Sequence, residues 1–130
     1  MSNNKIEWII IVTEKYQESR KFYRDILDFK IVRESVNEEF TQFKLGNLYF
    51  ATYGRKQVEK LVGKKYLSNV GSTIFTFAET DNIDKQYDEL KTKGVRFIIP
   101  PTTQPWGQRT AYFLDPDGYI WEIQQWVKKT

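Results

Sequence analysis

The stretch WGQRTAYFLDPDGYIWEI, residues 106–123, decides the fold of this chain. Residues 110–114 are an apolar run rich in β-forming side chains, and residues 119–127 are a second one. Asp115-Pro116-Asp117-Gly118 lies between them and predicts a turn, because proline presets φ and glycine permits a positive φ. We assign no chemistry to the turn. The stretch therefore predicts two strands joined by a tight connection.

The residues before this stretch predict the same order of strands and helix in each half of the chain. In the second half, Thr80 or Asp81 can cap a helix and Gly94 can end it. In the first half, Thr13 can cap a helix that ends near Asp28. The other expected strands, recognised by apolar or alternating residues, are 6–12, 29–33, 40–45, 48–53, 72–78 and 95–99. The order βαβββ therefore occurs twice.

This repetition predicts the fold class and the organisation of the chain. At 130 residues the length suits one domain. We expect an α+β fold in which two βαβββ modules form curled four-stranded sheets that enclose a cleft. Module one covers residues 1–53 and module two covers residues 71–130. The polar, lysine-rich residues 54–70 are expected to be a linker with one short helical turn at 58–62.

The composition excludes several kinds of chemistry. The chain has no cysteine and no histidine. Disulfides and thiolate metal sites are therefore excluded, and so is catalysis by Ser-His-Asp or Cys-His groups. Aromatic residues make up 16% of the chain, a high share; core packing needs some of these rings, and a ring-lined pocket would use them too.

Charge and hydropathy predict the partners and the cellular compartment of the protein. The net charge is +3, and the basic residues are densest at 55–65, which we interpret as a solvated linker. We therefore expect no nucleic-acid partner. The N-terminal apolar run is far shorter than the roughly 20 residues that span a bilayer, and it lacks the features of a signal peptide. We expect a cytoplasmic protein without a membrane partner.

Three segments in order resemble the vicinal-oxygen-chelate superfamily of glyoxalases, bleomycin-resistance proteins and extradiol dioxygenases. Residues 106–123 are similar to its signature of a Gly, an Arg, a hydrophobic strand, Asp-Pro-Asp-Gly and a Glu four residues later. FYRDILDF at 22–29 is similar to its helix-end pattern, with Asp28 in place of a glycine. Residues 84–95 are similar to its second helix, which ends in Lys-Gly-Val. The resemblance implies the same α+β fold.

Metal-dependent members of the superfamily hold a divalent ion in the cleft with ligands from both modules. The resemblance implies four corresponding positions here. The first is Glu7 or Trp8, and the second is Phe50, the internal counterpart of Glu122. The third is Ser72 or Thr73, and the fourth is Glu122 itself. Zinc normally takes three protein ligands and non-haem iron takes two histidines and a carboxylate, so this set is a poor site. We expect no metal cofactor. The alternative is a weakly held divalent ion at Glu7 and Glu122, which are also the candidate catalytic residues.

The two carboxylates have competing interpretations. Strand alternation puts Glu122 on the same face as Ile120 and Gln124, and we expect that face to line the cleft rather than solvent. Glu7 is the lone charge in its apolar run, and simple exposure explains it equally well. If the two carboxylates meet without a metal, repulsion raises one pKa. They could then bind an amine-bearing ligand or act as acid and base.

Further side chains are candidates for the ligand site. Trp106 in its proline-rich loop is the best ring, ahead of Tyr112, whereas many of the other rings are expected in the core. Arg109 binds an anionic group or forms an ion pair with Asp115 or Asp117. The expected ligand-binding residues are Glu7, Phe50, Ser72, Trp106, Arg109, Tyr112 and Glu122, and further ring candidates are Tyr49 and Tyr53.

Three functions compete at this point. The preferred one is a metal-free protein that binds a small aromatic or heteroaromatic compound, as the bleomycin-resistance branch does. Bleomycin itself is not expected, because this chain is basic. The second is a divalent-metal lyase or isomerase of glyoxalase type, with a dioxygenase less favoured. The third is a regulatory or protein-interaction module. The resemblance also implies a homodimer.

Overall fold

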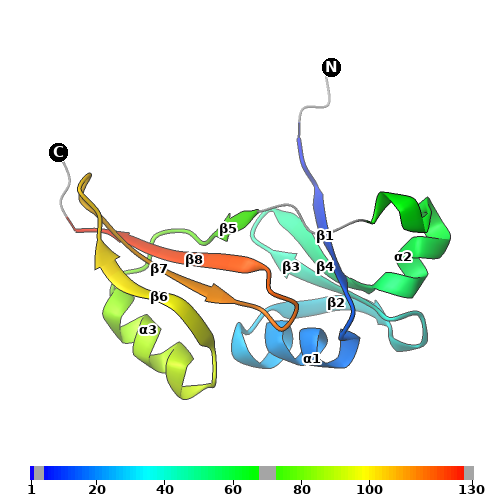
Figure 1. The fold of residues 1–130 in the computed structure, drawn as a ribbon, viewed down its shortest axis with the longest axis horizontal. Helices are drawn as coiled ribbons and strands as arrows, with labels where there is room; N and C mark the ends of the chain where they lie inside the picture. The colour runs from blue at the N-terminus through cyan, green and yellow to red at the C-terminus, as the bar shows by residue number, and fades with distance from the viewer. Residues whose placement is uncertain (2–4, 68–72, 128–130) are drawn as a thin grey trace. The chain divides into compact units, whose positions relative to one another are not determined.

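The computed structural model describes residues 1, 5–67 and 73–127, and the chain divides into two compact units, Met1–Val70 and Gly71–Thr130. Each unit contains one four-stranded mixed sheet (Figure 1). None of the helices in the described ranges has the length and apolar character needed to cross a membrane.

The first unit begins with strand β1 (Trp8–Thr13) and helix α1 (Tyr16–Lys21), which continues as a π-helical turn (Phe22–Ile26). Strands β2 (Lys30–Ser35), β3 (Phe40–Leu45) and β4 (Leu48–Gly54) follow, with a 3₁₀ turn (Val36–Glu38) between β2 and β3. Helix α2 (Arg55–Val62) and a second 3₁₀ turn (Lys64–Tyr66) end it. The strand order is β1-β4-β3-β2, in which β1 runs parallel to β4.

The second unit repeats this arrangement. It contains strand β5 (Ile74–Thr76), helix α3 (Ile83–Thr92), and strands β6 (Arg96–Thr103), β7 (Gln108–Leu114) and β8 (Ile120–Trp126). The strand order is β5-β8-β7-β6, and β5 runs parallel to β8. Two mixed sheets with three helices confirm the predicted α+β class.

Several local predictions need correction. Strand β6 runs through Pro100 and Pro101, which the sequence placed in a loop, and its pairing with β7 shifts register twice. Prolines are tolerated there because β6 is an edge strand. The cap of α3 is Asn82, whose side chain accepts a hydrogen bond from the Lys85 amide, rather than Thr80 or Asp81. Eight residues of the expected linker form α2.

The helix starts and ends follow simple backbone rules. Thr13 does not cap α1 itself, but its hydroxyl accepts a hydrogen bond from the Lys15 amide just before the first turn. Asp28 follows the π-helical turn with φ of 59°, the left-handed region that glycine adopts most easily. Gly94 follows α3 with φ of 89° and donates its amide to the Lys91 carbonyl, as expected of a helix stop.

The core of the first unit lies between its sheet and α1. Tyr23 is fully buried, and its ring contacts Phe50 and Phe43 from the sheet with centroids 4.8 and 6.1 Å apart. On the same face, the Ser19 and Thr52 hydroxyls are hydrogen-bonded at 2.7 Å. Strand alternation therefore turns the remaining side chains of β3 and β4 to the opposite face. We call that face the ring face; its rings are Trp8, Phe40, Tyr49 and Tyr53.

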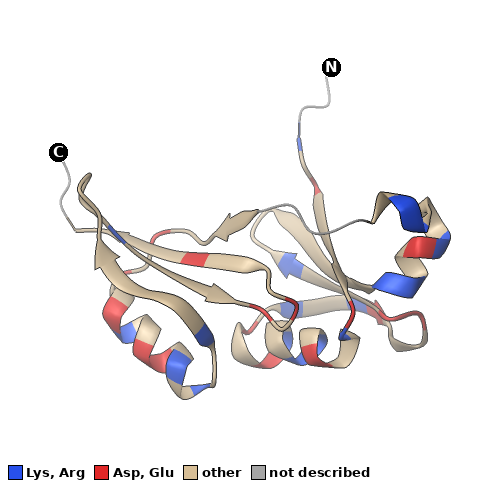
Figure 2. Cartoon of the chain, viewed as in Figure 1, with Lys and Arg blue, Asp and Glu red and all other residues tan. Residues whose placement is uncertain are grey.

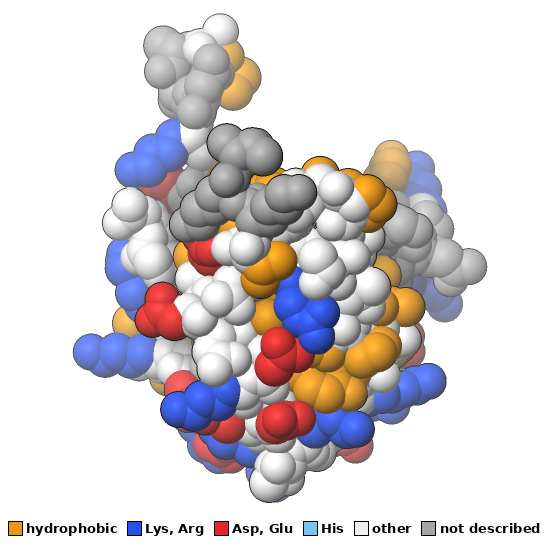
Figure 3. All heavy atoms as spheres, turned by 90° about the vertical axis from the view of Figure 1, so that its left-hand side faces the viewer, with side chains coloured by type: hydrophobic (Ala, Val, Ile, Leu, Met, Phe, Trp, Pro, Cys, Tyr) orange, Lys and Arg blue, Asp and Glu red, His pale blue; other side chains and the backbone are white. Residues whose placement is uncertain are grey.

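The core of the second unit lies between its sheet and α3. Buried residues from both layers are Ile83, Leu90, Ala111, Phe113, Trp121 and Ile123. Tyr87 of α3 contacts Phe97 of β6 with ring centroids 4.5 Å apart. The side of the molecule that carries α3 and β6 shows hydrophobic side chains in small groups among polar and charged ones (Figure 3), as on an ordinary solvated surface.

Candidate functional site

A polar surface covers the face of the second sheet opposite α3. Trp121 and Ile123 of β8 are 3% and 1% exposed and point into the core, so Glu122 and Gln124 point the other way. We call this surface the carboxylate face; it contains Thr76, Gln108, Tyr112, Glu122 and Gln124, and the fully buried Thr110 lies on the same side of the sheet. Glu122 is the one charged residue of β8 and appears as a red segment in the tan strand (Figure 2). The predicted face of Glu122 is therefore a distinct polar surface of one unit.

Glu122 is held at the centre of this face by two hydroxyl groups. Thr76 of β5 and Tyr112 of β7 lie directly opposite it in the strand register. The Thr76 hydroxyl donates to Glu122 Oε1 at 2.7 Å. The Glu122 carboxylate also accepts a hydrogen bond from the Tyr112 hydroxyl, and this raises the pKa of Tyr112, with burial adding to the rise and the Thr110 hydroxyl opposing it. The carboxylate is thus oriented by neutral donors.

Among the described residues, Glu122 forms no ion pair within 4.0 Å. No cationic side chain therefore helps to hold its carboxylate. Its two oxygens offer about four acceptor positions, and the hydroxyls occupy two of them. The carboxylate therefore retains acceptor positions and a charge that a ligand can use.

A chain of amide side chains extends the face towards Trp106. The Trp106 Nε1 donates to Gln108 Oε1 at 3.0 Å, and Gln108 Nε2 donates to Gln124 Oε1 at 3.0 Å. Gln124 in turn donates to the Phe77 carbonyl at 3.3 Å. The Trp106 side chain, which is 59% exposed, is thereby tied to the same face as Glu122. Two predicted ligand residues, Trp106 and Tyr112, thus share this face with Glu122.

Sequence reasoning missed Thr76, Gln108 and Thr110 on this side of the sheet and did not name Gln124 as a ligand-site residue. Alternation along β8 already placed Gln124 beside Glu122, so that signal was present. Thr76 is brought to Glu122 by the parallel pairing of β5 with β8, whose register cannot be read from either strand alone.

Arg109 lies on the opposite face and is not part of the site. Its Nε and Nη2 atoms donate to the two carboxylate oxygens of Asp84 on α3 at 3.2 and 2.8 Å. This pair raises the pKa of Arg109 and lowers that of Asp84. The ion-pair alternative is therefore the one observed, with Asp84 as the partner instead of Asp115 or Asp117. Because β7 alternates, Arg109 points away from Tyr112, which contacts Glu122.

Phe50 is a core residue rather than a ligand contact. It is 1% exposed and lies beneath Tyr23. The strand registers pair Phe50 with Phe43 and Trp121 with Phe113, and all four rings are buried in the cores, so Phe50 is the internal counterpart of Trp121. The counterpart of Glu122 is therefore Ala51, which has no ligating group, and the expectation that Phe50 holds this place is corrected.

The remaining predicted residues are in the N-terminal part of each unit. Glu7 is exposed and precedes β1, where its carbonyl accepts a hydrogen bond from the Tyr49 amide at 2.7 Å. Trp8, the alternative to Glu7, begins β1, and its ring lies 5.1 Å from that of Tyr49 on the ring face. Ser72 lies outside the described residues, and Thr73 is exposed.

The divalent ion implied by the resemblance does not fit the side chains seen here. Within residues 5–67 and 73–127, no three or more His, Cys, Asp or Glu side chains come together as an ion site. The neighbours of Glu122 are hydroxyls, which are weak ligands for zinc or iron without further carboxylate or imidazole groups.

Comparison with known proteins identifies the family. Residues 5–123 match the family model of the Glyoxalase/Bleomycin resistance protein/Dioxygenase superfamily, and the chain belongs to that superfamily. A crystal structure of a glyoxalase/bleomycin resistance protein/dioxygenase from Nocardioides has a TM-score of 0.84 and 25% identity, covering 100% of this chain and 88% of that chain. The predicted resemblance is confirmed.

Two curated relatives cover most of the chain. The uncharacterized protein YraH of Bacillus subtilis is 28% identical over 123 residues, which are 92% of this chain and 96% of YraH. The metallothiol transferase FosB of Staphylococcus saprophyticus is 28% identical over 106 residues, which are 82% of this chain and 66% of FosB. The superfamily thus includes relatives whose names indicate enzymes as well as relatives without a stated activity.

Proposed function

We propose that this protein binds a small aromatic or heteroaromatic compound carrying an amine or similar N–H donor, without a metal, on the carboxylate face. The observation that carries the proposal is the Glu122 carboxylate, oriented by Thr76 and Tyr112 and without a cationic partner among the described residues. A carboxylate in such a setting favours a ligand that brings the positive charge or the donor.

The surroundings of Glu122 support a flat ligand. Trp106 is fixed by its hydrogen bond to Gln108 while most of its ring remains exposed. An exposed, oriented indole offers a stacking surface, and stacking contributes about 0.5–1.5 kcal/mol beyond the buried area. The Gln108 and Gln124 amides add donors and acceptors that can fix the orientation of a heteroaromatic ring.

Calorimetric titration with 9-aminoacridine, a planar aromatic cation, tests the proposal. We expect Glu122→Gln to raise the Kd about tenfold or more, because a charge-assisted hydrogen bond is lost while the shape is kept. Trp106→Ala is expected to raise it about threefold to tenfold. Anthracene-9-carboxylate, which has a similar ring system and the opposite charge, should bind more weakly than 9-aminoacridine.

A matched control is Glu89→Gln, because Glu89 is an exposed carboxylate on α3 whose one ion pair among the described residues is with Lys85. It removes the same charge away from the carboxylate face, and the Kd should stay at the wild-type value. Equal affinities for wild type and Glu122→Gln, or tighter binding of the anionic compound, would refute this site.

The second candidate is a divalent-metal-dependent lyase or isomerase, and the similarity to a relative named as a metallothiol transferase favours an enzyme over a binding protein. Metal analysis of the purified protein and thermal unfolding with added divalent ions separate the two candidates. One tightly bound ion per chain, with a Tm rise of several degrees, would support the enzyme and contradict the metal-free proposal.

A further inference from the structure

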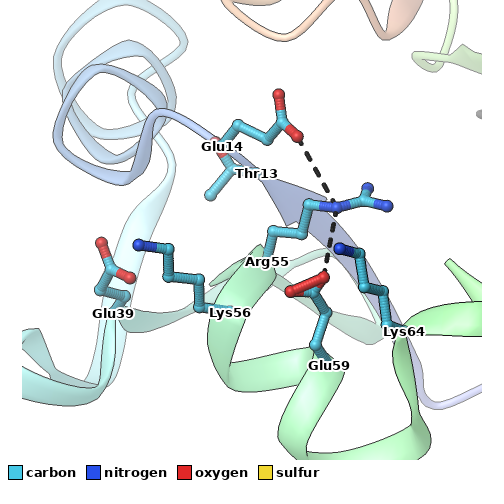
Figure 4. Close-up of a pocket in the computed structure, with 7 residues that line it drawn as sticks. All are labelled: Thr13, Glu14, Glu39, Arg55, Lys56, Glu59 and Lys64. Carbon is cyan, nitrogen blue, oxygen red and sulfur yellow. Dashed lines mark ion pairs between the residues drawn. The ribbon is translucent and has the colours of Figure 1, made fainter.

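A cavity of about 540 Å³ lies at the start of α2, and all of its lining residues belong to the first unit. Its charged lining consists of Glu14, Glu39, Arg55, Lys56, Glu59 and Lys64 (Figure 4). These residues come from four separate segments: the β1–α1 turn, the residue before β3, α2, and the 3₁₀ turn after it. The volume is within the usual range of small-molecule sites.

The cavity is placed where two parallel strands end. Thr13, the last residue of β1, is paired with Gly54, the last residue of β4, and α2 begins at the next residue, Arg55. In open α/β sheets, ligands commonly bind outside the carboxyl ends of the parallel strands. The parallel pair of β1 and β4 ends in the same way at this cavity. Here the cavity, its charged walls and the strand ends coincide.

Only some of the charged side chains in the cavity wall form ion pairs within the protein. The Arg55 guanidinium lies 3.6 Å from Glu14 and 3.9 Å from Glu59 (Figure 4). It also donates a hydrogen bond to the Leu67 carbonyl. In contrast, Lys56, Lys64 and Glu39 form no ion pair within 4.0 Å among the described residues. Two ammonium groups and one carboxylate therefore remain for a ligand.

Glu39 is fixed at the edge of this cavity. Its φ of 53° is left-handed, and its carbonyl accepts a hydrogen bond from the Gly54 amide at 2.8 Å. Its side chain occupies the space over Gly54, where an added Cβ would come within 2.5 Å of Oε1. The carboxylate is thus held beside the first turn of α2.

The start of α2 is unusual for a helix without a ligand. Gly54 offers no capping side chain, and the first turn contains Arg55 and Lys56 but no acidic residue. Positive side chains at a helix N-terminus oppose its dipole, whereas a bound carboxylate group complements it. The local sequence therefore favours a negative group in the cavity, beside the carboxylate of Glu39.

We propose that this cavity binds a small zwitterion of the α-amino-acid type. Its ammonium group pairs with Glu39, and its carboxylate pairs with Lys56, Lys64 and the first turn of α2. A doubly charged anion such as phosphate is disfavoured because Glu14, Glu39 and Glu59 share the same walls. The site is separate from the carboxylate face, and neither proposal depends on the other.

Amide-resolved NMR titration with L-leucine at millimolar concentration tests this site. We expect shifts at Thr13, Gly54 and Lys56, with the Glu122 and Tyr112 amides unchanged. N-acetyl-L-leucine lacks the ammonium group and L-leucine methyl ester lacks the carboxylate, so each should bind at least about tenfold more weakly. Inorganic phosphate should produce smaller shifts than L-leucine at equal concentration.

Variants on the wall complete the test. Lys64→Gln and Glu39→Gln should each raise the Kd for L-leucine about tenfold. Lys60→Gln, an exposed change on α2 outside the lining, should leave it unchanged. Because Lys64 is exposed, its variant keeps the test valid even if the Glu39 variant folds poorly. Absent shifts, equal binding of N-acetyl-L-leucine, stronger binding of phosphate, or an unaffected Lys64→Gln variant would each overturn the proposal.

Discussion

Replacing Phe50 by alanine should destabilise the first unit strongly and leave ligand binding intact. The ring is 1% exposed, and its centroid lies 4.8 Å from that of Tyr23 and 5.7 Å from that of Phe29, both in edge-on contact. Removing a buried phenylalanine ring typically lowers the free energy of unfolding by about 3–5 kcal/mol, which includes the cavity left behind. Each lost ring pair accounts for roughly 0.5–1.5 kcal/mol of that value.

Urea unfolding followed by circular dichroism measures the change. Tyr49→Ala is the matched control, because Tyr49 is the neighbouring residue on the ring face and is only half-buried. We expect it to cost less than half as much as Phe50→Ala. If Phe50→Ala cost under about 1 kcal/mol and abolished binding of 9-aminoacridine, Phe50 would be a ligand residue and the assignment of the two faces would be wrong.

Three further predictions follow from contacts described in both units. Glu34→Gln removes a two-pronged pair with Arg20, in which both N–O distances are 2.8 Å, and should cost about 1 kcal/mol at pH 7. The pair lowers the pKa of Glu34. The ion pair therefore stabilises the fold above the ordinary glutamate pKa, and this stabilisation is lost as the pH falls through the lowered pKa. The urea unfolding curves of wild type and variant should converge in acid. Gly54→Ala should cost about 1–3 kcal/mol through collision with Glu39, and far less when combined with Glu39→Gly, as thermal unfolding of all three variants would reveal. Arg109→Gln should lower the Tm by only a few degrees and leave the Kd for 9-aminoacridine unchanged, whereas a weakened Kd would return Arg109 to the ligand site.

The strands and their order could be predicted because apolar periodicity and turn residues agree locally. β3 begins and ends where alternation placed it, and the Asp115–Gly118 turn separates β7 from β8 as expected. The face on which Glu122 lies also followed from alternation along one strand. These signals are contained within single segments, so no partner strand is needed to read them.

Phe50 was misplaced because the two modules turn differently before the equivalent strand. Leu45 pairs with Leu48 across a two-residue turn, whereas Leu114 pairs with Ile120 across five residues. The first paired residue lies two positions after the glycine in both modules, but Leu48 is on the core face with Phe50, whereas Ile120 is on the opposite face with Glu122. A shift of one residue exchanges the faces of a strand, and only the pairing register reveals it.

Helix α2 was underestimated because its sequence lacks the usual starting signals. It has no capping side chain and begins with two basic residues, and Val58 is its one buried residue. The basic cluster at 55–65 was interpreted as a solvated linker for the same reason. The position of this cluster beside the ends of β1 and β4 depends on tertiary packing.

Ala51 and Glu122 take corresponding places in two modules of one architecture, and this difference limits how alike the two modules can become. The methyl group of Ala51 is completely enclosed, so this position has no spare volume for a longer side chain. An acid there would be an ionised group in an enclosed space, which is energetically unfavourable. A carboxylate at this point of the fold is therefore confined to the second module.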